Sequence, residues 1–327
     1  MLNHRHDLMY GDIKLFSGTS CEPLAQKIAD YIGIPLCERK IIEFANENLF
    51  VQLGGSVRGQ DCYVIQTTSR PVHRNLMELL ILIQTLKLDS AARITAVVPY
   101  FCYARSDKKD QPRVPITAKL VADMIEVAGA DRYILVDLHA GQIQGFFNIP
   151  GDALTAYHQM ILNLRDLKKN MINPVVVSTD LGFAKRARNI AAKLETPLAF
   201  IEKRRTGNDS STEALTVIGE VEKRDVILVD DEIDTGSSMV NAINLCKKLG
   251  ARDIYVNFVH PVFSANAVQR LAEAPAKLYI TTDTIPIPQE SMDLLGDRLM
   301  ILSVSQLLGE VIHRANRGVS VGSMFNE

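Results

Sequence analysis

The chain has 327 residues, of which 47% are apolar, and its formal net charge at pH 7 is -2. This length favours two domains, and the near-neutral charge argues against a nucleic-acid-binding or membrane-binding protein. The five cysteines contain no CxxC pair, which argues against a disulfide framework or a zinc site and favours a reducing cytoplasm. No apolar run reaches the roughly 18 residues that a membrane helix needs. The polar N-terminal segment lacks the apolar core of a signal peptide.

Short apolar runs alternate with amphipathic segments along most of the chain. The apolar runs predict strands at Cys62–Thr67, Ile94–Val98, Arg132–Val136, Pro174–Ser178, Val226–Val229, Ile254–Val259 and Leu278–Thr282. The amphipathic segments predict helices at Cys21–Ile32, Pro71–Leu88, Thr117–Ala128, Phe183–Leu194 and Ser238–Leu249. This alternation predicts an α/β protein whose parallel sheets are covered by helices on both faces.

The alternation runs through the chain twice. Ile134–Asp137 and Ile227–Asp230 have similar sequences, and each leads into a polar loop. We therefore expect two similar α/β halves. Turn-forming residues cluster at Ile149–Asp152, which predicts the boundary between the halves there.

The segment Val226–Ser238 has the strongest functional pattern in the chain. The apolar run is followed by Asp230, Asp231 and Asp234, then by Thr-Gly-Ser-Ser and a helical pattern. In open α/β sheets ligands bind beyond the carboxyl ends of the strands, and the N–H groups at a helix start favour a phosphate. Carboxylates repel a phosphate. We therefore expect the three acids to bind something else, such as ribose hydroxyls or magnesium. The segment therefore predicts a ribose-phosphate site.

Three other kinds of loop could have a similar composition. An EF-hand loop would need Gly and Glu where Thr235 and Asn241 stand, and the chain contains no Walker A motif. An acidic surface loop is the remaining alternative. The order of two acids, a third acid and small residues at a strand end favours the ribose-phosphate site over this alternative.

Two further predicted strands also end in polar residues. His139 follows one of them and Asp180 follows another. Carboxylate oxygens suit magnesium, which usually bridges protein to substrate phosphates. His139 is equally consistent with a metal or phosphate ligand and with a histidine that satisfies loop carbonyls.

Basic clusters lie just beyond two predicted apolar stretches. They are Arg105–Lys109 and Lys203–Arg205, and a third cluster, Lys185–Arg188, falls on a helix. Each one alone is more simply explained as a solvated face. A loop that carries Lys and Arg can also close over a transferring phosphoryl group.

These motifs together resemble the ribose-phosphate pyrophosphokinase (PRPP synthetase) family over nearly the whole length. Val229–Ser238 resembles the PRPP-binding signature that this family shares with type I phosphoribosyltransferases. The segments that resemble the synthetases themselves are Tyr103–Asp107, Pro115–Leu120, Asp137–Ala140, Gln142–Phe147, Lys203–Arg205, Leu302–Val304 and Val319-Ser320.

The resemblance implies two phosphoribosyltransferase-like (type I) domains. The N-terminal domain would span residues 1–152, joined by the tail 306–327, and the C-terminal domain would span residues 153–305. It also implies a homo-oligomer, a hexamer in the family. The implied reaction transfers the β,γ-diphosphate of ATP to the 1-hydroxyl of ribose 5-phosphate and releases AMP.

The resemblance also implies roles for individual residues. The residues for ribose 5-phosphate would be Asp230, Asp231, Asp234, Thr235, Gly236, Ser237 and Ser238. The residues for ATP would be Phe44, Asn46, Asn48, Arg105 and Asp107. His139 and Asp180 would hold Mg²⁺, and Lys203 and Arg205 would be catalytic.

The chain departs from the family pattern in several places, and one of them bears on the nucleotide site. Phe44-Ala45-Asn46-Glu47-Asn48 stands where the family usually has Phe-Ser-Asp-Gly-Glu near the nucleotide base. Neutral amides can still form hydrogen bonds, but they replace two carboxylates, so the change bears on nucleotide preference. The change at Asn46 and Asn48 keeps open the alternative of a non-catalytic regulatory homologue. The PRPP-binding signature shared with the transferases keeps open a second alternative, a phosphoribosyltransferase that consumes PRPP.

Overall fold

The computed structural model describes residues 10–205 and 213–324. The chain divides into two compact units, each with its own sheet. Unit 1 runs to Thr155 and takes in Thr284–Pro286 and the segment that begins at Ser303. Unit 2 comprises Ala156–Asp283 and Ile287–Leu302. Within the described residues, no helix has the length and apolar character required to cross a membrane.

Unit 1 is built on a five-stranded parallel sheet with the strand order β1-β4-β5-β6-β7. The strands are β1 (Ile13–Ser17), β4 (Asp61–Ile65), β5 (Arg93–Val98), β6 (Arg132–Val136) and β7 (Gly151–Leu154). The antiparallel hairpin of β2 (Arg39–Glu43) and β3 (Leu49–Leu53) forms a separate small sheet. The helices are α1 (Glu22–Ile32), α2 (Val72–Leu88), α3 (Thr117–Ala128), α9 (Ser305–Arg317) and the 3-10 turns η1 (Gly141–Phe146) and η3 (Gly322–Met324).

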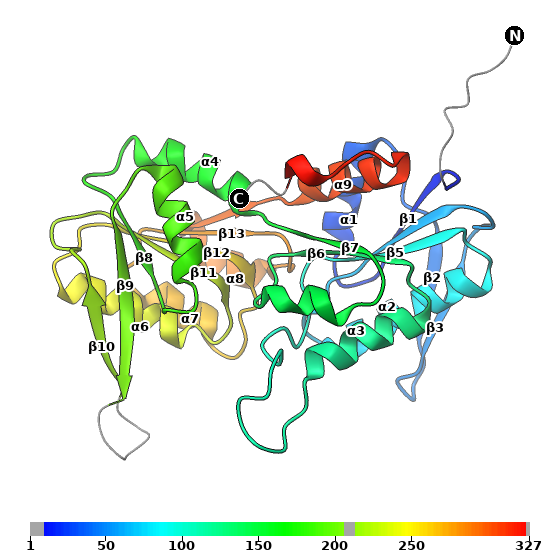
Figure 1. Ribbon diagram of the computed structural model, residues 1–327, viewed down its shortest axis with the longest axis horizontal. Coiled ribbons are helices and arrows are strands. Elements are labelled where there is room, and N and C mark those ends of the chain that lie inside the picture. Colours follow the sequence, from blue (N-terminus) through cyan, green and yellow to red (C-terminus); the bar gives the residue numbers. More distant parts are fainter. Residues whose placement is uncertain (1–9, 206–212, 325–327) are drawn as a thin grey trace, which may run out of the picture. The chain divides into compact units, whose positions relative to one another are not determined.

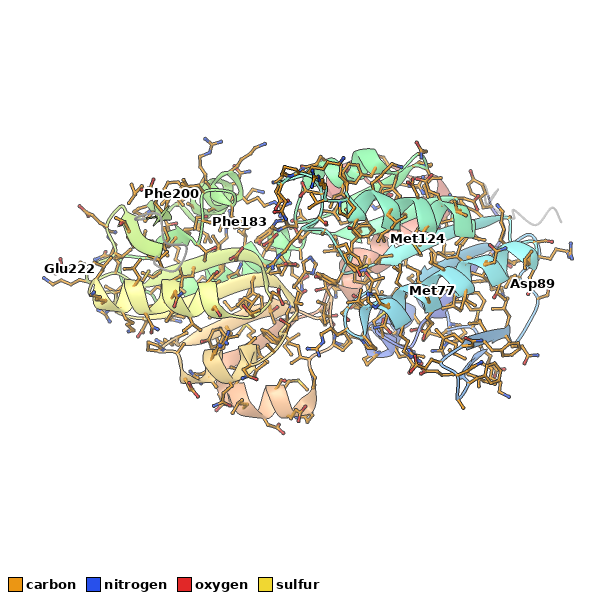
Figure 2. The ribbon with its side chains drawn as sticks, turned by 90° about the horizontal axis from the view of Figure 1, so that it is seen from below. Met77, Asp89, Met124, Phe183, Phe200 and Glu222 are labelled. Atoms are coloured by element: carbon orange, nitrogen blue, oxygen red, sulfur yellow. The ribbon has the colours of Figure 1, made fainter. Side chains whose placement is uncertain are left out.

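Helices cover both faces of the unit 1 sheet (Figure 1). Figure 2, seen from below, shows α2 and α3 side by side, with Met77 and Met124 labelled on them. The apolar side chains of these two helices and of the strands form one core. On the other face α9 packs closely against α1, because Gly309 has no side chain. A Cβ atom there would lie 2.5 Å from Cδ1 of Tyr31.

Unit 2 is built on a seven-stranded sheet with the order β10-β9-β8-β11-β12-β13-β14. All neighbouring strands are parallel except the pair β9 and β10. The strands are β8 (Val175–Ser178), β9 (Leu198–Arg205), β10 (Glu213–Ile218), β11 (Val226–Ile233), β12 (Ile254–Pro261), β13 (Leu278–Thr282) and β14 (Leu299–Leu302). The helices are α4 (Tyr157–Lys168), α5 (Ala184–Leu194), α6 (Ser237–Lys248), α7 (Ala267–Glu273), α8 (Gln289–Leu295) and the 3-10 turn η2 (Gly296–Arg298). Figure 1 shows α4 and α5 on one face of this sheet and α6 and α7 on the other.

The predicted α/β class is confirmed, and most predicted elements are found within one or two residues. The helix Thr117–Ala128 and the strand Arg132–Val136 have the predicted bounds. The predicted end of the strand at Val229 is wrong, because β11 continues to Ile233. Its neighbour β12 runs on to Pro261, so Glu232 and Ile233 still pair with His260 and Pro261. The hairpin of β2 and β3 was not predicted.

A buried ion pair links the C-terminal helix of unit 1 to its sheet. Arg93 donates two hydrogen bonds to the carboxylate of Asp61, at 2.8 Å from Nε and 2.6 Å from Nη2. Both side chains are almost fully buried. Arg93 also donates to the carbonyl of Ala315, and Asn316 donates to Asp61 at 2.9 Å. The pair therefore satisfies polar groups on two strands and on α9 at once.

Asp61→Asn removes the negative charge and leaves the Arg93 guanidinium buried without a counter-ion. We expect the free energy of unfolding to fall by about 3–5 kcal/mol, the usual result of breaking a buried pair on one side. Denaturant titration followed by circular dichroism measures this loss. The matched control is Asp166→Asn. Asp166 pairs with Lys169 on the protein surface, so this substitution should change the free energy of unfolding only slightly. Equal losses in the two variants would contradict the structural role given to the buried pair.

Candidate active site

The carboxyl ends of β8 and β11 bring the acidic residues of unit 2 together. β11 pairs in parallel with β8 on one side and with β12 on the other, so all three strands end at the same edge of the sheet. Thr179, just after β8, donates a hydrogen bond of 2.6 Å to Oδ2 of Asp230. Tyr157, the first residue of α4, donates to the carbonyl of Asp230 at 2.6 Å. Asp230 is therefore fixed from two elements.

Asp230 lies in an environment that disfavours its charge. Burial raises the pKa of its carboxyl group well above the usual value, and the neighbouring charges of Asp231 and Asp180 raise it further. The hydrogen bond from Thr179 acts in the opposite direction and lowers that pKa. Carboxyl groups whose pKa is shifted by burial and by neighbouring charges occur frequently at functional sites.

The loop after β11 leads into helix α6 through a left-handed glycine. Gly236 has φ +77°, and α6 begins at Ser237 without a side-chain cap. The first N–H groups of a helix have no partner inside the helix, so this end can bind an anion. Thr235, Ser237 and Ser238 are exposed here, and their hydroxyl groups can add further donors.

The segment after β12 holds this loop in place. The backbone N–H of Phe263 donates to the carbonyl of Ile233, and that of Ser264 donates to the carbonyl of Asp234, both at 3.0 Å. The hydroxyl of Ser264 also donates to the carboxylate of Asp234. The carboxylate predicted to bind a substrate hydroxyl is therefore oriented by a neighbouring loop.

Sequence reasoning missed Arg270, which contacts this loop from helix α7. Its Nη1 atom donates to the carbonyl of Thr235 at 3.1 Å and to Oγ of Ser237 at 2.6 Å. No local pattern marks Arg270, because it lies 35 residues after Thr235 in the sequence. Only the packing of α7 against α6 brings it to the loop.

Asp180 lies at the same edge of the unit 2 sheet. Its carboxylate is exposed and accepts a hydrogen bond of 2.8 Å from the backbone N–H of Phe183, just before α5. The hydroxyl of Ser178 donates to the carbonyl of Asp180 at 2.7 Å. These bonds fix the turn, and an exposed carboxylate on a fixed turn can bind a cation.

In unit 1 the segments of Arg105 and His139 meet. Asp107 is buried and accepts a hydrogen bond from the side-chain amide of Gln142, in η1 directly after the His139 segment. Arg105 and His139 are both exposed. Asp107 therefore ties the two loops together, a contact that its predicted role in ATP binding does not include.

The residue before the His139 turn has a strained backbone. Asp137 has φ +40°, which is rare for a residue with a side chain. Its buried carboxylate accepts a hydrogen bond of 2.8 Å from the hydroxyl of Thr155, and its N–H donates to the carbonyl of Leu154 at 2.9 Å. Strain held in this way often marks a functional turn.

The predicted nucleotide segment forms the tight turn of the hairpin between β2 and β3. The side-chain oxygen of Asn46 accepts a hydrogen bond of 3.2 Å from the backbone N–H of Asn48, and the N–H of Phe44 donates to the carbonyl of Asn48 at 2.9 Å. Glu47 has φ +65°, a conformation that glycine adopts more readily. The turn therefore holds Glu47 in a backbone conformation that costs a residue with a side chain more than it would cost a glycine.

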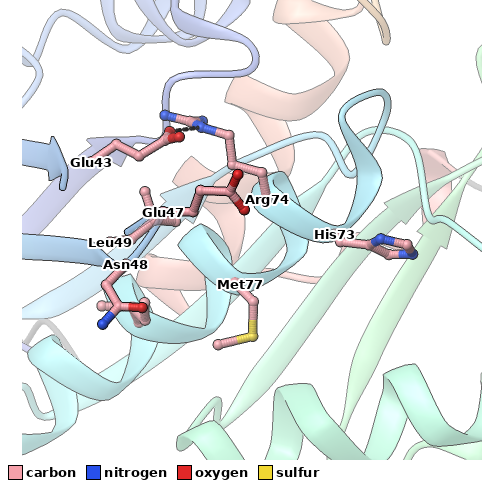
Figure 3. Close-up of a pocket in the computed structure, with 8 residues that line it drawn as sticks. Glu43, Glu47, Asn48, Leu49, His73, Arg74 and Met77 are labelled. Carbon is pink, nitrogen blue, oxygen red and sulfur yellow. Dashed lines mark hydrogen bonds and ion pairs between the residues drawn. The ribbon is translucent and has the colours of Figure 1, made fainter. Parts of the chain in front are cut away.

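A cavity of about 480 Å³ lies between this hairpin and helix α2 (Figure 3). Its lining residues are Glu43, Glu47, Asn48, Leu49, His73, Arg74, Met77 and Ile81. Arg74 pairs with Glu43 at 2.6 Å across the cavity. His73 forms a hydrogen bond of 2.9 Å with the hydroxyl of Tyr103, which belongs to the loop of Arg105. The hairpin and the Arg105 loop are thus connected through the start of α2.

Lys203 and Arg205, the two predicted catalytic cations, lie at the end of β9. Their backbones pair with Leu215 and Glu213 of β10. Their side chains, like residues 206–212, lie outside the described part of the protein. The strand at least places both residues just before a connection between two antiparallel strands.

The described residues contain no group of three or more His, Cys, Asp and Glu side chains arranged to hold a metal ion. Magnesium does not require such a group, because it is commonly bound through one or two carboxylates, several waters and substrate phosphates. The crowded carboxylates of Asp180, Asp230 and Asp231 fit this mode of binding.

Comparisons with known proteins agree with this architecture. Residues 13–129 match the N-terminal domain of ribose phosphate pyrophosphokinase, and residues 208–326 match the phosphoribosyl synthetase-associated domain. The chain is 42% identical to the ribose-phosphate pyrophosphokinase of Aquifex aeolicus, over 96% of this chain and 99% of that protein. It is 45% identical to the one from Caldanaerobacter subterraneus, over 96% and 98%. The chain belongs to the ribose-phosphate pyrophosphokinase family.

A solved structure extends this similarity to three dimensions. The phosphoribosylpyrophosphate synthetase from Mycobacterium smegmatis superposes with a TM-score of 0.88 at 39% sequence identity, covering 94% of this chain and 99% of that chain. Membership of the ribose-phosphate pyrophosphokinase family therefore rests on the sequence and on the fold of 94% of the chain.

The raised pKa of Asp230 gives a prediction for the pH dependence of stability. When the folded-state pKa of a carboxyl group lies above its unfolded value, ionisation destabilises the folded protein, so stability falls as the pH rises from about 4 through the folded pKa. In magnesium-free buffer, Asp230→Asn should therefore raise the midpoint of thermal unfolding at pH 8, and this gain should vanish near pH 4.

Asp297→Asn, which changes an exposed carboxylate of η2 in the same unit, serves as the control and should leave the midpoint unchanged across this range. A lower midpoint for Asp230→Asn at pH 8 would show that the ionised carboxylate stabilises the fold, contrary to this account.

Proposed function

We propose that the protein makes PRPP with the residues predicted from its sequence. The reaction is that of a ribose-phosphate diphosphokinase: ATP and ribose 5-phosphate give PRPP and AMP. The 1-hydroxyl oxygen of ribose 5-phosphate bonds to the β-phosphorus of ATP. The bond between that phosphorus and the oxygen shared with the α-phosphorus breaks, and AMP leaves.

The observation that carries the proposal is the geometry at the end of β11. Carboxylates at Asp230 and Asp231 are followed within a few residues by the uncapped start of α6. The hydroxyl groups of a ribose suit the carboxylates, and its 5-phosphate suits the helix N-terminus. The residues proposed to bind ribose 5-phosphate are Asp230, Asp231, Asp234, Thr235, Gly236, Ser237 and Ser238.

For ATP we propose residues of unit 1. Arg105 is an exposed cation suited to phosphate oxygens. The hairpin turn with Phe44, Asn46 and Asn48 is proposed to contact the base, and Phe44 is half exposed and able to stack. The side chain of Asn46 already stabilises the turn itself, so Asp107 and Asn46 are proposed to act mainly by fixing their loops.

Two groups are proposed for the chemical step. His139 in unit 1 and Asp180 in unit 2 are each proposed to hold Mg²⁺ together with substrate oxygens. Mg²⁺ would neutralise the phosphate charge that repels the incoming hydroxyl. Lys203 and Arg205 would stabilise the charge that develops on the transferring diphosphate. We propose that the protein acts in the cytoplasm as a homo-oligomer.

The direct test is an assay of purified protein with ATP, ribose 5-phosphate and Mg²⁺. We expect AMP and PRPP in equal amounts, no product after chelation with EDTA, and recovery when excess Mg²⁺ is added. A regulatory homologue without activity would give no AMP under any of these conditions. A PRPP-consuming transferase would instead need a base and would release pyrophosphate from PRPP.

Lys203→Ala and Arg205→Ala test the roles of the two cations. Loss of one preorganised donor to a developing charge typically lowers kcat by about 10²–10³-fold. We expect such a loss of turnover with the KM for ribose 5-phosphate changed only a few-fold. Lys248→Ala, on the exposed C-terminal turn of α6, is the control and should retain normal turnover. A large rise in KM at full turnover would assign the cations to substrate binding instead.

A further inference from the structure

The guanidinium of Arg270 lies at the point where the proposed phosphate site begins. Its Nη1 atom donates to the carbonyl of Thr235 and to the hydroxyl oxygen of Ser237, which stand on either side of Gly236. Ser237 is the first residue of α6. Arg270 therefore contacts the segment whose N–H groups are proposed to bind the 5-phosphate.

The bonding pattern leaves donors for a ligand. A guanidinium has five N–H donors in a planar fork. Within the described part of the chain, the hydrogen bonds of Arg270 come from Nη1 alone, so Nε and Nη2 have no protein acceptor. The hydroxyl oxygen of Ser237 accepts a hydrogen bond from Arg270, so the hydroxyl hydrogen of Ser237 points away from Arg270. Both groups can therefore donate to the same anion.

The support of Arg270 is fixed by packing. Gly236 lies against the start of α7, where an added Cβ would be 3.4 Å from Cα of Ala267. The N–H of Ala267 donates to the carbonyl of Ser264, and Ser264 is itself bonded to Asp234. Helix α7 and the loop are thus held as one assembly, which sets the position of the guanidinium.

The negative charge of the loop explains why a cation at the position of Arg270 would help to bind a phosphate. The loop contains Asp230, Asp231 and Asp234, and these carboxylates repel a phosphate dianion. The partial positive charge of a helix N-terminus is only about half of an elementary charge. A full positive charge beside the helix start offsets the repulsion, and the fork of an arginine matches phosphate oxygens in pairs.

We propose that Arg270 binds the 5-phosphate of ribose 5-phosphate and makes the site selective for the phosphorylated sugar. This inference rests on the proposed function, because it assigns a residue to the same acceptor site. It extends that site to a residue outside the motif Val229–Ser238.

The test compares Arg270→Gln and Arg270→Lys with the wild-type protein. For Arg270→Gln we expect the KM for ribose 5-phosphate to rise by about tenfold to a hundredfold, the range for losing a hydrogen bond between charged groups. The KM for ATP should change less than twofold. Arg270→Lys should be intermediate, since it keeps the charge and loses the fork.

Two further measurements separate phosphate binding from a structural role. Titration calorimetry with ribose 5-phosphate alone should show the same ordering of affinities, and the thermal midpoint of Arg270→Gln should remain near that of the wild type. Arg252→Gln is the matched control. Arg252 is half exposed and precedes β12, at the opposite edge of the sheet, so all of its constants should be normal.

Unchanged ribose 5-phosphate affinity in Arg270→Gln would overturn the inference, as would equal rises in both KM values together with a lower thermal midpoint. Failure of the proposed function looks different. In that case the wild type itself would bind ribose 5-phosphate without forming PRPP, and the calorimetric comparison would still decide the role of Arg270.

Discussion

The candidate site of unit 2 depends on the parallel pairing of β11 with both β8 and β12. Parallel strands end at the same edge of a sheet, so three connections that are distant in sequence meet there. Thr179 then reaches Asp230 from one side, and Ser264 reaches Asp234 from the other. Without this register the acidic residues would have no fixed positions, and α7 would not carry Arg270 to the start of α6.

The same geometry creates an electrostatic conflict. The carboxyl group of Asp230, whose pKa is raised, lies close in the chain to a helix start that favours an anion. In an unliganded protein this arrangement costs stability, as functional sites often do. In the proposed binding mode a sugar phosphate would resolve the conflict, because its hydroxyl groups would face the carboxylates and its phosphate would face the N–H groups and the guanidinium of Arg270. The instability of the free site thus favours a ligand with both kinds of group.

Much of the fold follows from local patterns in the sequence. Periodic apolar residues predicted helices such as α3 and strands such as β6 with their observed bounds. The failures have physical reasons. The acids Asp231 and Glu232 do not look like strand residues, yet β11 extends through them because β12 supplies a partner. The hairpin of β2 and β3 forms a separate antiparallel sheet, so it lies outside the strand–helix alternation on which the prediction was based.

The sequence indicated the part of the candidate site whose residues are contiguous. It did not indicate the residues that only the packing of other elements brings there. The motif from Asp230 to Ser238 was visible in the sequence as an acidic run before a helix. Arg270 and Tyr157 reach the same loop from other elements, and only tertiary contacts reveal them. Asn46 was proposed from the sequence to contact ATP. The structure shows that its side chain also stabilises the hairpin turn, by accepting a hydrogen bond from the N–H of Asn48.

The central claim is that the edge of the unit 2 sheet binds the sugar phosphate. A crystal structure of the protein soaked with ribose 5-phosphate tests it most directly. The account predicts the 5-phosphate on the backbone N–H groups between Gly236 and Met239, and the ribose hydroxyls near Asp230 and Asp231. Sugar phosphate bound at another position, with this loop left in contact with water alone, would contradict it.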